Sequence, residues 1–302
     1  MSVSTPTNRS VHGDVEETRL KNSAARLSIL AAAFLILIKS GTGWLTGSIA
    51  VWASLLDSAM DIFASTINYF AVRAAARPPD EDHAYGHGKA ESLAGLFQAA
   101  VITFSGLFLI WEAFRRIIQP QPTQSETIGV ATMLIAIVIS IALVARLRRV
   151  AKLTDSPALS ADAVHFASDV WTNGGVLLAL LLISVSGWNM IDPLISIGIS
   201  LYILASALSV GRESVDVLMD RRLPPDVDER VAEIVTRFRD EGVHGYHDLR
   251  TRRSGSQKFI DLHLEMEGSK TLAEAHATSV RVLRTIEAEI PRSHVQIHTD
   301  PA

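Results

Sequence analysis

The sequence predicts a helical membrane protein: six transmembrane helices, then a C-terminal soluble α+β domain of ferredoxin-like αββαβ order. The mean hydropathy of +0.25 and a charged fraction of only 20% over 302 residues are too apolar for an ordinary soluble domain. The apolar residues form long runs before about residue 212, and charged residues and histidines become dense after it. We therefore expect a polar N-terminal arm at 1–24, a membrane domain at 25–211 and a soluble domain at 212–302.

Six apolar stretches are each long enough to cross a hydrocarbon core of about 30 Å, which takes about 20 helical residues. They lie at 25–46, 48–75, 92–117, 125–148, 158–184 and 190–211. The sequence has no cysteine, so disulfides and thiolate ligands are excluded and any metal must be held by nitrogen and oxygen. The net charge of -4 gives no indication of nucleic-acid binding.

Lysine and arginine collect on one side of the predicted spans, apart from Arg115 and Arg116 near the turn after the third span. The turns after the first and fifth spans contain none. The basic residues lie on the other side of the membrane from these two turns. They are Arg9, Arg19, Lys21 and Arg26 before the first span, Arg77 and Lys89 after the second, and Arg146, Arg148, Arg149 and Lys152 after the fourth. Because short cytoplasmic loops carry the positive charge, both termini are predicted to lie in the cytoplasm.

Two of the predicted spans carry ionisable residues well inside their length. Asp57 and Asp61 are four residues apart in the second span, and His165 and Asp169 are four apart in the fifth. Residues at this spacing share one helix face. Because the two spans run in opposite directions, a rise of about 1.5 Å per residue puts all four groups near the membrane midplane, where they can converge.

Such a cluster needs a cation, protons or water, because each charge at the centre of a membrane helix costs about 2.5–3.5 kcal/mol. This argues against the alternative that these are isolated polar residues bonded to neighbouring helices. Three carboxylates and one imidazole suit a divalent ion such as Zn²⁺. Binding requires deprotonated ligands, so metal export can be coupled to proton import. Lys39, in the first span, is either a counter-ion or a side chain that reaches toward the headgroups.

The loop after the second span, "PPDEDHAYGHGKAE", contains Asp80, His83 and His87. The paired prolines and two glycines indicate a constrained loop. The three side chains are close enough in sequence for a local oxygen-and-nitrogen metal site, although a solvated polar loop remains an alternative.

The C-terminal domain is predicted from two kinds of periodicity. Val231, Ile234 and Val235 repeat at helical spacing, and Ile260, Leu262 and Leu264 alternate as in a strand. Its candidate ligands, on strand ends or on a helix that could cover them, are His247, His263, His276, His298 and Asp300.

The pairs "DSAMD" and "HFASD", six spans and a histidine-rich C-terminal domain resemble the cation diffusion facilitator family, in particular its bacterial ferrous-iron and zinc efflux pumps. The resemblance runs from about residue 20 to the end and includes "HDLRTRRSG", "FIDLHLEME" and "VQIHTDP". It implies a homodimeric Zn²⁺/H⁺ antiporter of the bacterial inner membrane, with Cd²⁺ and Fe²⁺ as further substrates and no organic cofactor. The implied transport site consists of Asp57, Asp61, His165 and Asp169.

The resemblance further implies an accessory metal site in the loop and a binuclear zinc site in the C-terminal domain, near the dimer interface. It also implies that Lys89 pairs with Asp220 across the dimer. A metal-permeable channel is the alternative function, although a full tetrahedral ligand set argues against easy exit of the ion. An enzyme is disfavoured because "HFASD" lacks the glutamate base of an H-E-x-x-H helix.

Overall fold

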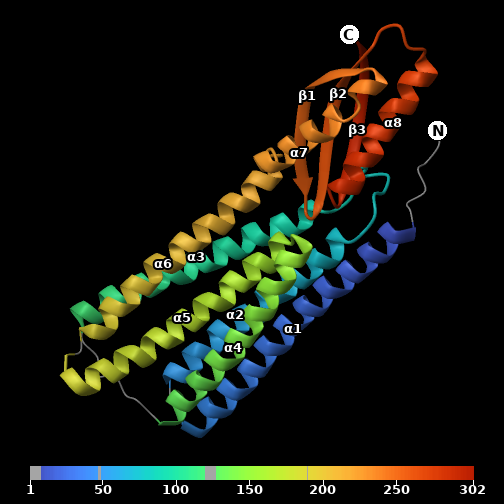
Figure 1. Cartoon of the computed structure of the whole chain (residues 1–302). Helices are drawn as coiled ribbons and strands as arrows, with labels where there is room; N and C mark the ends of the chain where they lie inside the picture. Colours follow the sequence, from blue (N-terminus) through green and yellow to red (C-terminus); the bar gives the residue numbers. More distant parts are fainter. Residues whose placement is uncertain (1–7, 47–48, 120–126, 189) are drawn as a thin grey trace. The chain divides into compact units, whose positions relative to one another are not determined.

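Six long helices form the first part of the computed structural model, and a three-stranded sheet with two helices forms the second (Figure 1). The backbone divides into two units, Met1–Val215 and Asp216–Ala302. The structure describes residues 8–46, 49–119, 127–188 and 190–302. Within these ranges, the side chains of residues 8–14, 43, 45–46, 49–57 and 127–129 lie outside the description.

The helices of the first unit match the predicted spans in number and order. They are α1 (Asn8–Thr46), α2 (Ile49–Ala75), α3 (Lys89–Ile118), α4 (Thr127–Thr154), α5 (Pro157–Ser186) and α6 (Ile191–Leu218). Among the described residues, segments of α1, α3, α4, α5 and α6 have the length and apolar composition of membrane spans. The predicted helical membrane domain is thus confirmed, with α2 as a sixth long helix whose first residues have no described side chains.

Three helices extend further than the sequence indicated. α1 begins at Asn8, inside the predicted arm. α4 continues to Thr154, so the basic residues assigned to the loop after it lie in the last turns of a helix instead. α6 continues to Leu218, past the predicted end at residue 211. Hydropathy marks only the apolar part of a helix, and these ends are polar.

Local signals define both ends of α5, the helix that carries His165 and Asp169. Ser156 is the N-cap and accepts a hydrogen bond from the Leu159 amide, and Pro157 occupies the first turn. Both features favour a helix start, since proline lacks an amide that would need a partner there. Gly187 ends the helix in the left-handed conformation with φ of 69°, which glycine adopts at little cost.

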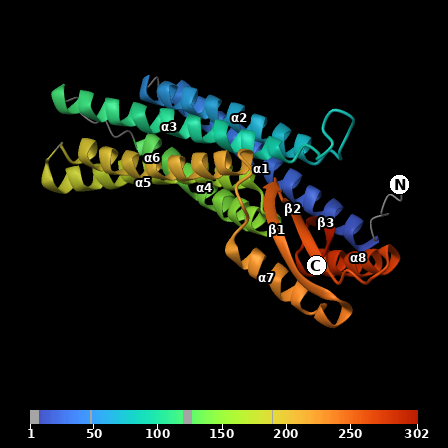
Figure 2. The same ribbon diagram turned by 90° about the horizontal axis from the view of Figure 1, so that it is seen from above.

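Small residues let the helices of the first unit pack closely. α1 packs against α2 and α4, and α5 packs against α3 and α4 (Figure 2). Ala24, Ala25, Ala158 and Ala163 are buried at these contacts together with Phe166. Close backbone approach through small side chains is a common packing mode between membrane helices. It brings the faces of α1, α2 and α5 together inside the bundle.

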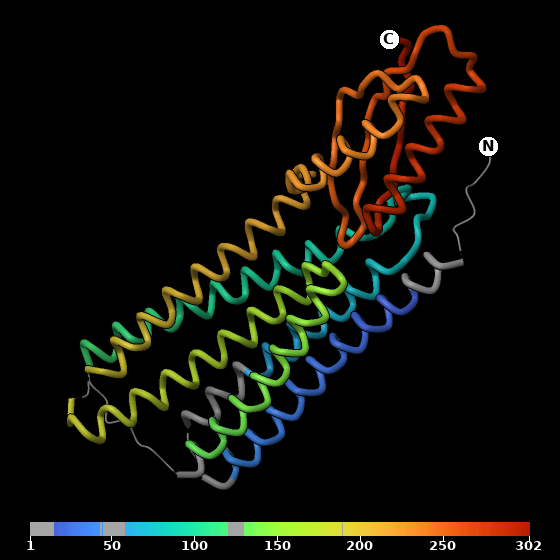
Figure 3. The backbone as a smooth tube through the Cα atoms, in the orientation of Figure 1, coloured from blue at the N-terminus to red at the C-terminus, as the bar shows by residue number. Residues whose placement is uncertain are grey.

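The C-terminal unit consists of α7 (Pro225–Thr236), a short 3₁₀ turn η1 (Arg239–Glu241), β1 (Val243–Ser254), β2 (Gln257–Met266), α8 (Leu272–Glu289) and β3 (Ser293–Pro301). The sheet order is β1-β2-β3. β1 and β2 form an antiparallel hairpin, and β3 joins β2 in parallel after the α8 crossover (Figure 3). The predicted αββαβ order is therefore confirmed. The alternating residues Ile260, Leu262 and Leu264 are buried in its core, as their spacing indicates.

Strand register aligns three histidines across this sheet. His247 on β1 is opposite His263 on β2, and His263 is opposite His298 on β3. The β1–β2 register shifts between His247 and Arg250, and Asp248 within this irregularity has a φ of 49°. A bulge of this kind changes the direction of side chains at the edge of a sheet.

Candidate metal centres

Three of the four ionisable side chains expected inside the membrane lie together between α2 and α5. His165 Nε2 is 2.9 Å from Asp61 Oδ1, and Asp61, His165 and Asp169 each offer one ligand atom within 4.8 Å of the others. Asp61 is 5% exposed and His165 is 4% exposed. We call these three residues the membrane triad. Their arrangement follows from the one-turn spacing on α5 and the packing of α5 against α2.

Asp57, the fourth expected member, lies one turn before Asp61 on α2, and its side chain is outside the described residues. Its convergence with the membrane triad therefore stays a prediction from helical spacing. The neighbouring Ser58 Oγ accepts a hydrogen bond of 2.6 Å from Lys39 Nζ. Lys39 thus contacts α2 beside the position of Asp57.

The sequence patterns do not single out Asp162, which is fully buried on α5 one turn before His165. Ser28 Oγ of α1 donates a hydrogen bond of 2.6 Å to Asp162 Oδ2. The sequence does contain a signal for Asp162: it lies three residues before His165 and therefore on the same helix face. Asp162 adds a third ionisable group to this face of α5.

A second buried carboxylate, Glu91 in the first turn of α3, was also missed. It is 2% exposed and accepts a hydrogen bond of 3.0 Å from Lys21 Nζ of α1 and another from the Ser156 hydroxyl at the start of α5. Lys21 also pairs with Glu17 at 2.9 Å. We call Lys21, Glu91 and Ser156 the Glu91 node. Here a lysine of the chain supplies the cation that a buried carboxylate needs.

The loop between α2 and α3 brings Asp80, His83 and His87 together. Asp80 Oδ1 accepts a hydrogen bond of 2.7 Å from the His83 amide, and Asp80 Oδ2 is 3.3 Å from His87 Nε2. One ligand atom from each of the three lies within 4.8 Å of the others. The hydrogen bond from the His83 backbone lowers the pKa of the Asp80 carboxyl, which favours the deprotonated form that a metal requires.

Two overlapping groups lie on the surface of the sheet in the C-terminal unit, and His263 belongs to both. One contains His247, Asp248 and His263, and the other contains His263, His298 and Asp300. Asp300 Oδ2 is 2.8 Å from His263 Nδ1 and 3.2 Å from His247 Nε2. The His263 hydrogen bond lowers the pKa of Asp300. We call these five residues the tail cluster.

The tail cluster differs from the expected set in two residues. Asp248 was not expected, and it enters through the bulge in β1. His276 was expected, but it is exposed on α8 and belongs to none of the ligand groups found among the described residues. The core residues Thr278, Val282 and Ile286 define the buried face of α8, and His276 lies off that face.

The two partners of the expected dimer contact lie in different units. Lys89 begins α3 in the first unit. Asp220 follows α6 in the second, has a φ of 56° and has its Oδ1 atom 3.5 Å from Arg252 Nη1. Their pairing across a dimer stays a prediction.

All three clusters offer only imidazole nitrogen and carboxylate oxygen. This donor set suits divalent first-row ions, Zn²⁺ among them. The membrane triad differs from the other two in its burial, since the loop and tail groups are half-buried or exposed.

Two family models match the two parts of the chain. Residues 25–219 match the family described as the cation efflux transmembrane domain, and residues 223–302 match the cation efflux protein cytoplasmic domain. The zinc form of CzrB, a solved structure, is 32% identical and has a TM-score of 0.26, covering 27% of this chain and 92% of that chain.

Two similar curated proteins are both named cation-efflux pump FieF. The one from Klebsiella pneumoniae subsp. pneumoniae is 44% identical over 94% of this chain and 94% of its own length. The one from Yersinia pestis is 44% identical over 95% of each chain. The expectation of a transporter rather than an enzyme is confirmed by these relatives. The resemblance read from the sequence is confirmed as well: the chain belongs to the cation efflux, or cation diffusion facilitator, family.

Proposed function

We propose that this protein exports a divalent cation from the cytoplasm in exchange for protons, with Zn²⁺ as the main substrate and Cd²⁺ and Fe²⁺ as further ones. The observation that carries the proposal is the membrane triad. A histidine and two aspartates, two of them almost fully buried, offer ligand atoms within 4.8 Å of one another inside a bundle of membrane helices. The names of the curated relatives, cation-efflux pumps, support the direction of transport.

Competition between metal and protons at this triad is the proposed coupling mechanism. Buried carboxylates are stable in a membrane interior when a cation or a proton neutralises them. A metal binds only the deprotonated ligands, so its arrival displaces protons and its departure lets protons return. If the site opens to each side of the membrane in turn, the outward movement of one metal ion requires the inward movement of protons.

The fourth ligand in this proposal is Asp57. Zinc sites are usually four-coordinate and tetrahedral, and the membrane triad supplies three donors. Asp57 lies one turn from Asp61 on α2, which is the spacing between His165 and Asp169 on α5. Two facing helices would then contribute two ligands each, so rocking of α2 against α5 would change access to the ion without dismantling either pair.

The remaining metal groups have supporting roles in the proposal. Asp80, His83 and His87 form an accessory cytoplasmic site, and the tail cluster binds zinc in the cytoplasmic domain. The protein acts as a homodimer in the bacterial inner membrane with both termini in the cytoplasm, and Lys89 pairs with Asp220 between the protomers. The cytoplasmic domain's match to the family supports this assignment.

Transport by purified protein in proteoliposomes tests the proposal. Zn²⁺ flux should rise when an imposed pH gradient drives protons in the opposite direction. Asp61→Asn should abolish the flux, whereas Asp82→Asn, at an exposed position in the loop, should leave it unchanged. A Zn²⁺ flux that is lost in Asp61→Asn but does not change with the proton gradient would favour a channel. Flux that survives Asp61→Asn would disprove the proposed site.

A further inference from the structure

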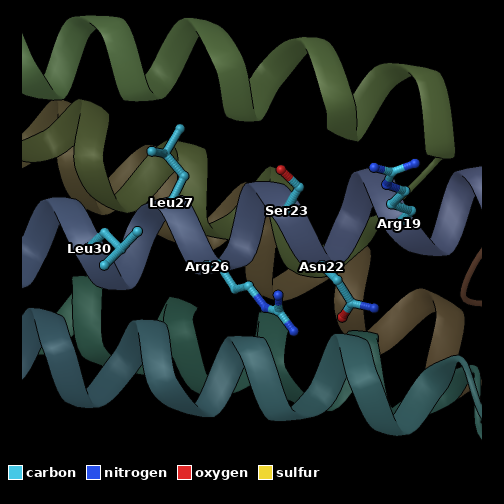
Figure 4. Close-up of a pocket in the computed structure, with 6 residues that line it drawn as sticks. All are labelled: Arg19, Asn22, Ser23, Arg26, Leu27 and Leu30. Carbon is cyan, nitrogen blue, oxygen red and sulfur yellow. The ribbon is translucent and has the colours of Figure 1, made fainter.

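A pocket of about 540 Å³ lies on the outer face of α1, lined by Arg19, Asn22, Ser23, Arg26, Leu27 and Leu30. These positions form one face of the helix, since they recur at intervals of three and four residues. In Figure 4, Arg19 and Leu27 point toward the green helix above α1, and Asn22 and Arg26 point toward the teal helix below it. The two helices packed on α1 are α4 and α2. The pocket is therefore a groove over α1.

The two ends of this groove differ in chemistry. The end nearer the N-terminus carries two arginines, an amide and a hydroxyl. The other end carries Leu27, 41% exposed, and Leu30, 66% exposed. The same face continues with Phe34 and Leu37, which are 50% and 70% exposed. The groove thus passes from a basic, polar part to an apolar part along the axis of a helix that spans the membrane.

The two arginines of the groove carry charge that no acidic partner in the described structure neutralises. Arg26 is held by Tyr69 of α2, through a hydrogen bond of 3.4 Å and a ring contact at 5.8 Å, and its charge is not neutralised by that partner. Among the described residues, Arg19 has no ion pair or hydrogen bond. Asn22 Oδ1 is buried without a hydrogen-bond partner in the described structure; as an acceptor, this oxygen does not itself bind an anion.

Glu17 and Glu91 are each paired with Lys21 and not with the arginines of the groove. Glu17 pairs with Lys21, which in turn contacts Glu91 inside the bundle. This buried ion pair lies on a different face of α1 from Arg19 and Arg26, since Lys21 is 7% exposed and does not line the pocket. The groove therefore keeps two positive charges beside an apolar surface.

We propose that this groove binds an anionic phospholipid, with its phosphate at Arg19 and Arg26 and an acyl chain along Leu27 and Leu30. Guanidinium groups bind phosphate through charge-assisted, often bidentate, hydrogen bonds. From Arg19 to Leu30 the helix rises about 16 Å at about 1.5 Å per residue, which accommodates a headgroup and the upper part of a chain. Basic pockets between membrane helices are suited to anionic lipid headgroups.

Native mass spectrometry of the full-length, delipidated protein tests this site. Phosphatidylglycerol should bind more tightly than phosphatidylcholine of the same chains. The double variant Arg19→Gln/Arg26→Gln should bind phosphatidylglycerol roughly 30-fold more weakly, given several-fold per basic residue near anionic lipid. Arg19→Lys/Arg26→Lys should keep part of the preference. Glycerol phosphate, which lacks acyl chains, should compete poorly because it does not contact the leucines.

The matched control is Arg115→Gln/Arg212→Gln, which removes two exposed arginines of the same unit outside the groove and should leave phosphatidylglycerol binding unchanged. Equal affinity for the two lipids, or equal weakening in both double variants, would overturn the proposal. So would a groove variant that changes only the oligomeric state, since the face would then be a contact between copies. Strong competition by glycerol phosphate would indicate a site for soluble phosphate instead.

Discussion

The membrane triad and the tail cluster use the same two residue types in opposite surroundings. Asp61 and His165 are nearly inaccessible, whereas the side chains of His298 and Asp300 in the tail cluster are 67% and 30% exposed. Water can solvate the tail groups when no ion is bound. It cannot do so for the triad to the same extent, so in the proposed function the triad exchanges protons for metal. This difference in burial is the reason why we propose coupled transport at the membrane triad and metal binding alone at the tail cluster.

The Glu91 node extends this comparison, because its carboxylate is buried like that of Asp61 but is paired with a lysine of the chain itself. Lys21 and Ser156 satisfy Glu91 from two other helices. Asp61, in contrast, contacts His165, which is itself an expected metal ligand and not a lysine held in place as a partner. We therefore expect different roles for these two buried carboxylates: Glu91 joins helices, and Asp61 binds the transported ion.

The largest expected effect is at His165. His165→Ala removes a ligand from the membrane triad and should lower Zn²⁺ transport in proteoliposomes more than about 100-fold, beyond the 10–100-fold typical of residues that only support a ligand. His294→Ala replaces an exposed histidine that packs on Phe259 in the cytoplasmic domain. It should transport normally. Similar rates in the two variants would contradict the assignment of the triad.

The second effect concerns stability rather than transport. Glu91→Ala removes the carboxylate 3.0 Å from Lys21 Nζ, although Lys21 keeps its ion pair with Glu17 at 2.9 Å. It also removes the acceptor of the Ser156 hydroxyl. We expect a loss of about 2 kcal/mol in the free energy of unfolding, within the range for an unsatisfied buried polar group. Thermal unfolding of the protein in detergent, followed by intrinsic fluorescence, measures the change.

Two further variants test the physical reason for this loss. Glu112→Ala breaks the ion pairs of Glu112 with Arg115 and Arg116, whose side chains are about half exposed. It should cost less than about 1 kcal/mol, as expected for accessible pairs. Lys21→Met/Glu91→Leu replaces the buried pair with apolar groups and should recover most of the stability. A double variant as unstable as Glu91→Ala would show that the charges do not explain the effect.

The third effect separates the members of the tail cluster. His263 belongs to both ligand groups and His276 to neither. In a full-length background that carries Asp61→Asn and Asp80→Asn, His263→Ala should weaken Zn²⁺ binding by about tenfold or more, and His276→Ala by less than about twofold. Equilibrium dialysis measures both. Equal losses would show that α8 contributes a ligand after all.

Local spacing predicted the parts of these clusters that depend on one helix or one strand. The pairing of His165 with Asp169 follows from helical geometry, and the strand that carries His263 follows from the alternation of Ile260, Leu262 and Leu264. Spacing places Asp162 on the face of His165, but the contacts of Asp162 with Ser28 and of Glu91 with Lys21 could not be predicted in this way, because both partners come from α1. Such contacts depend on how helices rotate about their axes as they pack.

The same limit explains the two differences in the tail cluster. Asp248 joins it through an irregularity in the β1–β2 register, and no spacing rule places a bulge at that residue. His276 was assigned from its residue type and from the family resemblance. The rotation of α8 is fixed by Val282 and Ile286 in the core, and this places His276 on the solvent side.

The smallest expected effect is at the start of α8, where a protonation change alters local stability without any metal. Thr271 and Glu274 form a capping box, and the Thr271 hydroxyl and amide lower the pKa of Glu274. Because the folded pKa is depressed, the stabilisation is present above the unfolded pKa of about 4.3 and is lost as the pH falls through the lower folded pKa. Thr271→Ala should cost about 1 kcal/mol.

Hydrogen exchange of the first turn of α8 in the full-length protein measures this cap. The exchange rate should rise in Thr271→Ala at neutral pH, and in the wild type after correction for intrinsic rates as the pH falls below about 4.3. Glu274→Gln should remove the pH dependence while keeping part of the hydrogen bonding. Ser269→Ala changes a hydroxyl that donates to Glu267, before the helix, and should leave exchange in α8 unchanged. If the exchange rate of this turn changed neither in Thr271→Ala nor with pH, packing of the α8 core alone would determine where this helix begins.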